Sequence, residues 1–263
     1  MIFDCHIHTA ASPDGKMTPA EAIKTAENLG LGCIFTEHVD YNPEGEAFFC
    51  VDFDVYPEEY IKYKSDSVCL GLELGLIEEC VEQNRAHAAG FVNGRETIAY
   101  DYILGSVHWT AGFDIGYDPE SFFEERGIDA YCEHLMYIIN MIEKNDFFDA
   151  LGHIDYISRY SPFDEKNVLY GEYADIYDKL LMAIVERDKP LELSTRRMGE
   201  KSACKSLAEI YSRYHNLGGK YVTLGSDAHT ASAVGCYFDT ALEMIGEIGL
   251  QPVYFRERRM IIC

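Results

Sequence analysis

Short apolar runs alternate with stretches of helically spaced apolar residues along the whole chain. Seven runs rich in β-branched and aromatic residues predict β-strands, at residues 2–8, 33–38, 68–75, 101–109, 148–155, 190–195 and 221–229. Helical spacing predicts helices between most of them, at residues 18–29, 77–89, 119–144, 171–187, 202–217 and 232–247. Strand alternating with helix indicates parallel strands joined by crossovers, so we expect an α/β fold with a closed or nearly closed barrel. Residues 1–263 contain no linker or repeat and are predicted to form a single domain.

Local signals refine two segments of this pattern. Thr18, Pro19 and Glu21 combine an N-cap, a proline at the first helical position and a capping-box glutamate, so a helix should begin here. The connection from 39 to 67 carries two prolines, a glycine and many aromatic residues. We expect it to be a long loop with at most a short helix, covering the site.

Metal-ligand residues occur at the ends of most predicted strands. His6 and His8 alternate with apolar residues and therefore point to the same side of the first strand, as two ligands of one ion would. A histidine satisfied in the core is the alternative, but an H-x-H pair at a strand end favours ligation. Residues of the same kind lie at or near the ends of later strands: His38, Glu73, His108, His153, Asp227 and His229. Because active sites of such barrels lie at the carboxyl ends of the strands, these side chains should converge.

The number of these residues exceeds what one ion needs. A tetrahedral or five-coordinate site takes three or four protein ligands, so the set predicts two or three ions with a carboxylate such as Glu73 bridging them. Imidazole and carboxylate suit Zn, Mn and Fe alike, which leaves the metal open. Adjacent divalent ions activate water and clamp the oxygens of a phosphoryl group, so the pattern indicates a hydrolase.

The amino-acid composition limits the kinds of molecule that the protein is expected to bind. The chain has 45 acidic and 22 basic residues and a formal net charge of -23, which disfavours nucleic acid as a substrate but leaves a small anion open. The first residues lack the basic and apolar regions of a signal peptide, and no apolar stretch approaches the roughly 20 residues of a membrane span. We therefore expect a cytoplasmic protein with no membrane partner.

The ordered motifs resemble a known family. D-C-H-I-H-T, T-E-H, G-L-E-L-G, G-S-V-H, G-H-I-D and G-S-D-A-H follow one another along the chain as in the PHP (polymerase and histidinol phosphatase) domain family. The resemblance implies a distorted (βα)7 TIM-like barrel, which agrees with the seven predicted strands. It also implies a trinuclear centre with three sets of ligands: His6, His8, Glu73 and Asp227 on one ion, Glu73 with His108 and His153 on the second, and Asp14, His38 and His229 on the third. Some relatives place a histidine at Asp14, and an aspartate before glycine is also an ordinary turn residue.

The resemblance extends to a branch of the family. Chain length, S-P-D-G and G-H-I-D-Y-I-S-R-Y look most like the histidinol-phosphatase branch, which hydrolyses L-histidinol phosphate in histidine biosynthesis. That branch implies phosphate-binding arginines, here Arg159 and either Arg196 or Arg197. Arg159 as a plain surface charge is the alternative. Ser194 stands where the branch usually has asparagine, which leaves the substrate open.

A mechanism follows from this ligand set. A metal-bridging hydroxide would attack phosphorus, with Glu73, Asp227 and His229 as the catalytic residues. Three divalent ions less three carboxylates and one hydroxide leave a charge of about +2 for the phosphate. Asp4 and Asp155 are expected to orient ligating histidines.

Three other functions remain open. One is hydrolysis of another small phosphomonoester or a nucleotide, and one is a non-catalytic metal-binding barrel. An amidohydrolase-type barrel shares H-x-H but often uses a carboxylated lysine, whereas Glu73 stands at the strand end here.

Overall fold

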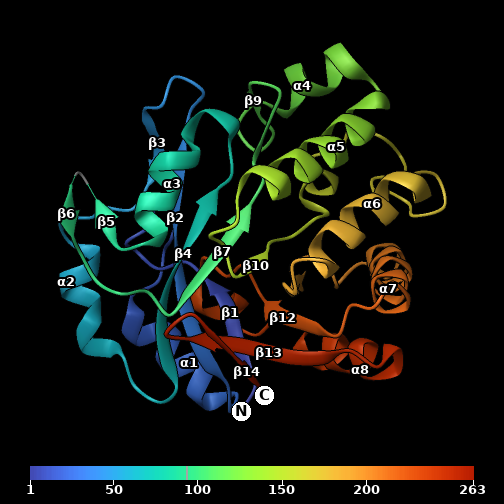
Figure 1. Cartoon of the computed structure of the whole chain (residues 1–263). Coiled ribbons are helices and arrows are strands. Elements are labelled where there is room, and N and C mark those ends of the chain that lie inside the picture. The colour runs from blue at the N-terminus through green and yellow to red at the C-terminus, as the bar shows by residue number, and fades with distance from the viewer. Residues whose placement is uncertain (93) are drawn as a thin grey trace.

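Seven parallel strands form the centre of the protein. The computed structural model describes residues 1–92 and 94–263, and within them these strands are β1 (Phe3–Ile7), β2 (Gly32–Tyr41), β4 (Val68–Gly75), β7 (Tyr102–Ser106), β10 (Ala150–Leu151), β11 (Leu191–Ser194) and β12 (Tyr221–Gly225). They pair in this order, each parallel to the next (Figure 1). Each corresponds to one of the seven predicted strand runs.

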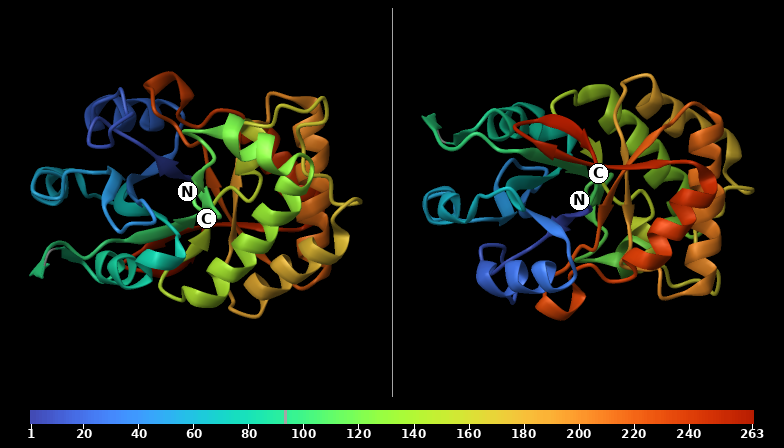
Figure 2. Two further views of the ribbon diagram at one scale, coloured as in Figure 1. Left: turned by 90° about the horizontal axis from the view of Figure 1, so that it is seen from above. Right: turned by 90° about the horizontal axis from the view of Figure 1, so that it is seen from below.

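The first strand also meets the segment that follows the seventh. Ile7 and Ala228 form a parallel bridge, and the His8 amide donates to the Ala228 carbonyl at 2.9 Å. The strands therefore curl round upon themselves, with helices on the outside (Figure 2). This arrangement agrees with the predicted TIM-like barrel.

The helices lie close to their predicted positions. They are α1 (Pro19–Asn28), α2 (Tyr56–Tyr60), α3 (Val81–Ala88), α4 (Pro119–Arg126), α5 (Asp129–Lys144), α6 (Ala174–Val185), α7 (Lys201–Asn216) and α8 (Phe238–Ile248), with 3-10 turns at Ile61–Tyr63, Glu78–Cys80, Tyr156–Arg159 and Ala231–Ala233. The capping box of Thr18 and Glu21 is present. The single helix predicted at 119–144 is wrong, because Gly127 adopts a φ of 57° that ends α4 before α5 begins. No helix among the described residues is long and apolar enough to cross a bilayer.

The connection from 39 to 67 is more ordered than expected. The strand β2 continues to Tyr41 and pairs with an antiparallel strand β3 (Ala47–Cys50) before α2 begins. Pro43 and Gly45 lie in the intervening turn, where they interrupt no ladder, and aromatic residues occupy the returning strand. The expected loop is thus a hairpin followed by a short helix.

The last segment forms a hairpin that the sequence pattern did not reveal. The strands β13 (Gln251–Arg256) and β14 (Arg259–Ile262) pair with each other, and β13 also pairs with β12. The ring of Tyr254 stacks on Phe3 at 3.9 Å, so the hairpin packs against the beginning of β1. Two further short strand pairs lie among the described residues, β5 (Phe91–Val92) with β6 (Arg95–Glu96) and β8 (Trp109–Thr110) with β9 (Phe113–Asp114).

Candidate metal centre

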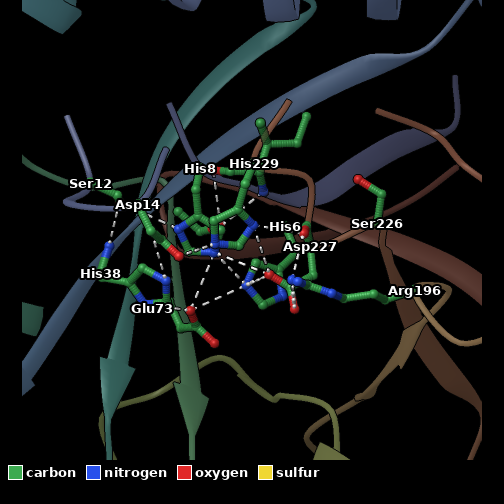
Figure 3. Close-up of polar contacts among 12 residues, drawn as sticks. His6, His8, Ser12, Asp14, His38, Glu73, Arg196, Ser226, Asp227 and His229 are labelled. Atoms are coloured by element: carbon green, nitrogen blue, oxygen red, sulfur yellow. Dashed lines mark hydrogen bonds and ion pairs between the residues drawn. The ribbon is translucent and has the colours of Figure 1, made fainter. Parts of the chain in front are cut away.

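Glu73 lies at the centre of the converging strand ends (Figure 3). Its Oε2 atom is 3.3 Å from Nε2 of both His6 and His8, which are themselves 2.9 Å apart. Its Oε1 atom is 2.8 Å from Nε2 of His153 and 3.3 Å from Nε2 of His108. One buried carboxylate therefore faces two separate histidine pairs, one with each oxygen.

Two more carboxylates extend the cluster. Asp227 follows β12 and places Oδ1 3.7 Å and 3.5 Å from Nε2 of His6 and His8. Its φ of 53° is strained for a residue with a side chain, as is common where a functional group must be aimed. Asp14 lies 2.7 Å from Nε2 of His229 and 3.7 Å from Nε2 of His38. The structure thus brings together all nine predicted metal ligands.

Acceptors behind the histidines determine which ring nitrogen faces the cluster. Glu192 accepts from Nδ1 of His6 at 2.6 Å, and Asp40 accepts from Nδ1 of His108 at 2.7 Å. The Nδ1 atom of His229 donates to the backbone carbonyl of Asp227 at 2.9 Å. These contacts assign a proton to Nδ1 of each ring. The Nε2 atom of each neutral ring then directs a lone pair into the cluster, as a metal ligand must.

The donor set fits divalent cations. The facing Nε2 atoms of His6 and His8 would place two lone pairs 2.9 Å apart, a repulsive arrangement that a cation relieves. Within residues 1–92 and 94–263, buried Glu73 Oε2 and Asp14 Oδ1 have no hydrogen-bond donor. Unpaired buried polar atoms are costly, so their concentration at one point indicates ions as the missing partners.

The charges of the cluster agree with this interpretation. Burial raises the pKa of Glu73, but His6 and His108 outweigh it and hold that pKa well below its usual range. For Asp227, burial again raises the pKa, and Arg159 and His6 hold it well below the ordinary value. Burial and the neighbouring His38 lower the pKa of His8 to about 4. Ionised carboxylates and a neutral His8 are protonation states that metal binding requires. Burial lowers the pKa of His6 and His108, but the carboxylates beside them outweigh it and hold that pKa well above its ordinary value, so a bound ion would replace a proton on each of these two rings.

A cavity of about 230 Å³ opens onto these ligands, and two arginines line it. Arg159 donates from Nη1 to Asp227 at 2.5 Å and from Nη2 to Ser194 at 3.3 Å. Arg196 reaches the same Asp227 carboxylate at 3.2 Å. A pair of guanidinium groups beside a metal-ligand cluster is suited to a phosphate.

Three comparisons with known proteins identify the family. The sequence model of the PHP domain matches residues 4–196. The chain belongs to the PHP family. It is 39% identical over 260 residues to a probable histidinol-phosphatase of Clostridium acetobutylicum, covering 99% of each chain. It is 26% identical to the histidinol-phosphatase of Lactococcus lactis, covering 95% of this chain and 92% of that protein. The crystal structure of the Lactococcus lactis histidinol phosphate phosphatase, complexed with zinc, L-histidinol and phosphate, matches with a TM-score of 0.87 at 24% identity, over 99% of this chain and 98% of that one.

Three expectations about this PHP site need correction. Arg197 does not line the cavity, because its guanidinium donates to Asp155 at 2.9 Å and to Asn167 at 2.7 Å. Among the described residues, Asp155 is therefore a partner of Arg197 and not of a ligating histidine. Within the part of the chain that the structure describes, Asp4 accepts from no imidazole: it accepts from the Ser226 amide at 2.9 Å, from the Ser226 hydroxyl at 2.5 Å and from the backbone amide of His6 at 3.3 Å, so it anchors the segment after β12 to β1.

The residues that do orient the PHP histidines are Glu192 and Asp40, and sequence reasoning missed both. Glu192 is fully buried in the L-E-L-S run of β11, between two apolar residues. A charged residue inside an otherwise apolar strand was the available signal for it. Asp40 lies two residues after His38 on β2 and so shares its side of the strand.

Proposed function

We propose that the protein is a metal-dependent phosphomonoesterase that hydrolyses L-histidinol phosphate to L-histidinol and phosphate. The observation that carries the proposal is the convergence of histidine and carboxylate ligands on Glu73 beside two arginines of one cavity. Relatives named histidinol-phosphatase that cover nearly the whole chain support the substrate. The substrate is then a small phosphorylated molecule of the histidine biosynthesis pathway.

The ligand assignment follows the distances around Glu73. We assign His6, His8 and Asp227 with Glu73 to one ion, and His108 and His153 with Glu73 to a second. Asp14, His38 and His229 form a third set, so the centre would hold two or three ions of Zn, Mn or Fe. Because β1 and the segment after β12 both contribute, we propose that residues 1–263 act as one PHP-type domain.

The side chains of the cavity would bind and orient the phosphate. Arg159 and Arg196 both contact Asp227, which holds their guanidinium groups at the edge of the ligand cluster. Their remaining N–H groups can donate to two phosphate oxygens and neutralise the charge that builds on them during the reaction. When bound, divalent ions supply an activated water and further neutralise the phosphoryl oxygens. The Ser194 hydroxyl accepts from Nη2 of Arg159 at 3.3 Å and so helps to fix its orientation.

Elemental analysis followed by a phosphomonoester panel tests the proposal. The purified protein should contain at least two divalent ions per chain, and kcat/KM for histidinol phosphate should exceed that for p-nitrophenyl phosphate, ribose 5-phosphate and AMP. Comparable values for all four esters would refute the substrate. Absence of phosphate release from every ester by metal-replete protein would refute the phosphatase itself.

A matched pair of arginine variants tests the phosphate site. Arg196→Gln should lower kcat/KM about 10- to 100-fold, as expected for loss of one charge-assisted hydrogen bond. Arg259→Gln removes the same charge from an exposed position of β14 and should change little. Equal effects of the two changes would show that net charge, and not contact with phosphate, is responsible.

A further inference from the structure

One wall of the cavity is not explained by metal or phosphate binding. Phe48 and Phe49 of β3 and Tyr117, which follows β9, line this wall together with Asp114 at the end of β9. The rings of Phe48 and Tyr117 meet edge to face, with centroids 5.6 Å apart. An aromatic wall with a single carboxylate differs in chemistry from the imidazole and guanidinium groups on the other side.

Asp114 differs from the other acidic residues that line the cavity. Each of the others contacts a histidine or an arginine: Asp14, Asp40, Glu73 and Asp227. Within residues 1–92 and 94–263, Asp114 has no cationic partner, and only its Oδ1 atom accepts hydrogen bonds, from the amides of Gly116 and Tyr117 at 2.8 Å each. Its second oxygen is thus available to a ligand in the cavity.

The position of Asp114 is held by the loop that carries it. A Cβ atom on Gly116 would lie 2.4 Å from the hydroxyl of Tyr156, so this loop packs directly on that side chain. The guanidinium of Arg159 lies over the ring of the same tyrosine, 5.2 Å from its centroid. Tyr156 therefore stands between the phosphate-binding arginine and the Asp114 loop, and a substrate of moderate length could reach both.

We propose that Asp114 binds the ammonium group of the substrate and so selects amino-alcohol phosphates over phosphomonoesters that lack a positive charge. The inference rests on the proposed phosphatase function. The dianionic phosphate of the substrate would lie on the side of the cavity that holds the arginines and the metal ligands. The ammonium group of the substrate would then lie against the carboxylate of Asp114, which two backbone amides hold in place. Neighbouring aromatic faces add to the attraction for a cation.

Two pairs of esters test the assignment. Histidinol phosphate is compared with its deamino analogue, imidazolylpropyl phosphate, and ethanolamine phosphate with propyl phosphate. In the wild type, kcat/KM should favour the amine of each pair, and Asp114→Asn should reduce that preference about 10- to 100-fold, the expected value of one charge-assisted hydrogen bond. Asparagine keeps an oxygen that accepts from Gly116 and Tyr117, so the loop should persist. Glu120→Gln removes a charge from the nearby exposed start of α4 and serves as the control.

The outcomes separate this assignment from the proposed function. An unchanged amine preference in Asp114→Asn, or an equal loss for both members of each pair, would overturn the role of Asp114. A wild-type preference for ethanolamine phosphate over propyl phosphate that Asp114→Asn abolishes would support the role of Asp114, even if histidinol phosphate proved a poor substrate. Poor hydrolysis of histidinol phosphate would overturn only the proposed substrate. Metal content, measured in every variant, should stay at the wild-type value.

Discussion

Replacing Glu192 by glutamine should weaken metal binding through the tautomer of His6. In the native protein Oε1 of Glu192 accepts from Nδ1 of His6 at 2.6 Å, and Oε2 accepts from the amide of His153 at 2.8 Å. A carboxylate satisfies both donors, but an amide has only one oxygen. In one orientation the amide donates to Nδ1 of His6, which moves the imidazole proton to Nε2, the atom that faces His8 and Glu73. In the other orientation the amide nitrogen opposes the His153 N–H.

The magnitude follows from these two orientations. A buried donor left without an acceptor costs about 1–3 kcal/mol. In the second orientation the variant keeps His6 as a metal ligand but leaves a buried donor without an acceptor. The loss of metal affinity therefore cannot exceed this cost, which corresponds to a factor of about 5 to 150 in apparent affinity. That range agrees with the roughly 10- to 100-fold typical of groups that orient a metal ligand.

A chelator competition measures the effect. Metal-free Glu192→Gln and wild-type proteins are titrated with zinc against a chromophoric chelator, and turnover is measured at limiting and at saturating metal. Glu209→Gln, on the exposed side of α7, is the matched control. We expect turnover to fall at limiting metal and to recover largely at saturation. Wild-type zinc affinity together with wild-type stability would refute the reasoning.

Three further changes probe the centre and its surroundings. Glu73→Ala should remove at least one bound ion and abolish turnover, because both of its oxygens face ligand pairs; an active, metal-replete variant would exclude a bridging role. Gly225→Ala places a Cβ atom 2.1 Å from Oε1 of Glu192 and 2.6 Å from Cβ of His6, so metal affinity and stability should both fall, the latter by about 1–3 kcal/mol in urea denaturation; an unchanged variant would contradict this close packing. Burial lowers the pKa of His87 to about 4 from an ordinary value of 6.5, so the unfolded chain binds more protons between these values and stability of the metal-free protein falls as pH is lowered through this window. His87→Gln should reduce that slope by up to about 1.4 kcal/mol per pH unit, and an unchanged slope would show that other groups account for it.

The metal ligands could be predicted because strand alternation and strand ends are visible in a sequence. His6 and His8 share a face by spacing alone, and parallel strands bring their carboxyl ends to one edge. Contacts that depend on rotamers were not visible in this way. Arg196 and Arg197 are neighbours in the chain, yet only Arg196 lines the cavity, because Asp155 and Asn167 hold the guanidinium of Arg197 elsewhere.

The sequence pattern also did not predict the short strands. The strands β3, β8 and β9 have too few residues to produce a clear period, and their stability comes from contacts with distant segments. They nevertheless carry Phe48, Phe49 and Asp114, which line the cavity. The ligand cluster was therefore more predictable than the surface that would select the substrate.

The bridge between Ile7 and Ala228 affects how the chain folds. His6 and Asp227, about 220 residues apart in the chain, approach each other only where the first and seventh strands meet. An ion held by both would act as a cross-link across this seam and would stabilise the folded chain by its binding free energy. A nascent polypeptide that has not yet reached Asp227 would lack this cross-link. Chelators should accordingly loosen the seam between the two ends of the barrel before they affect the strands between them.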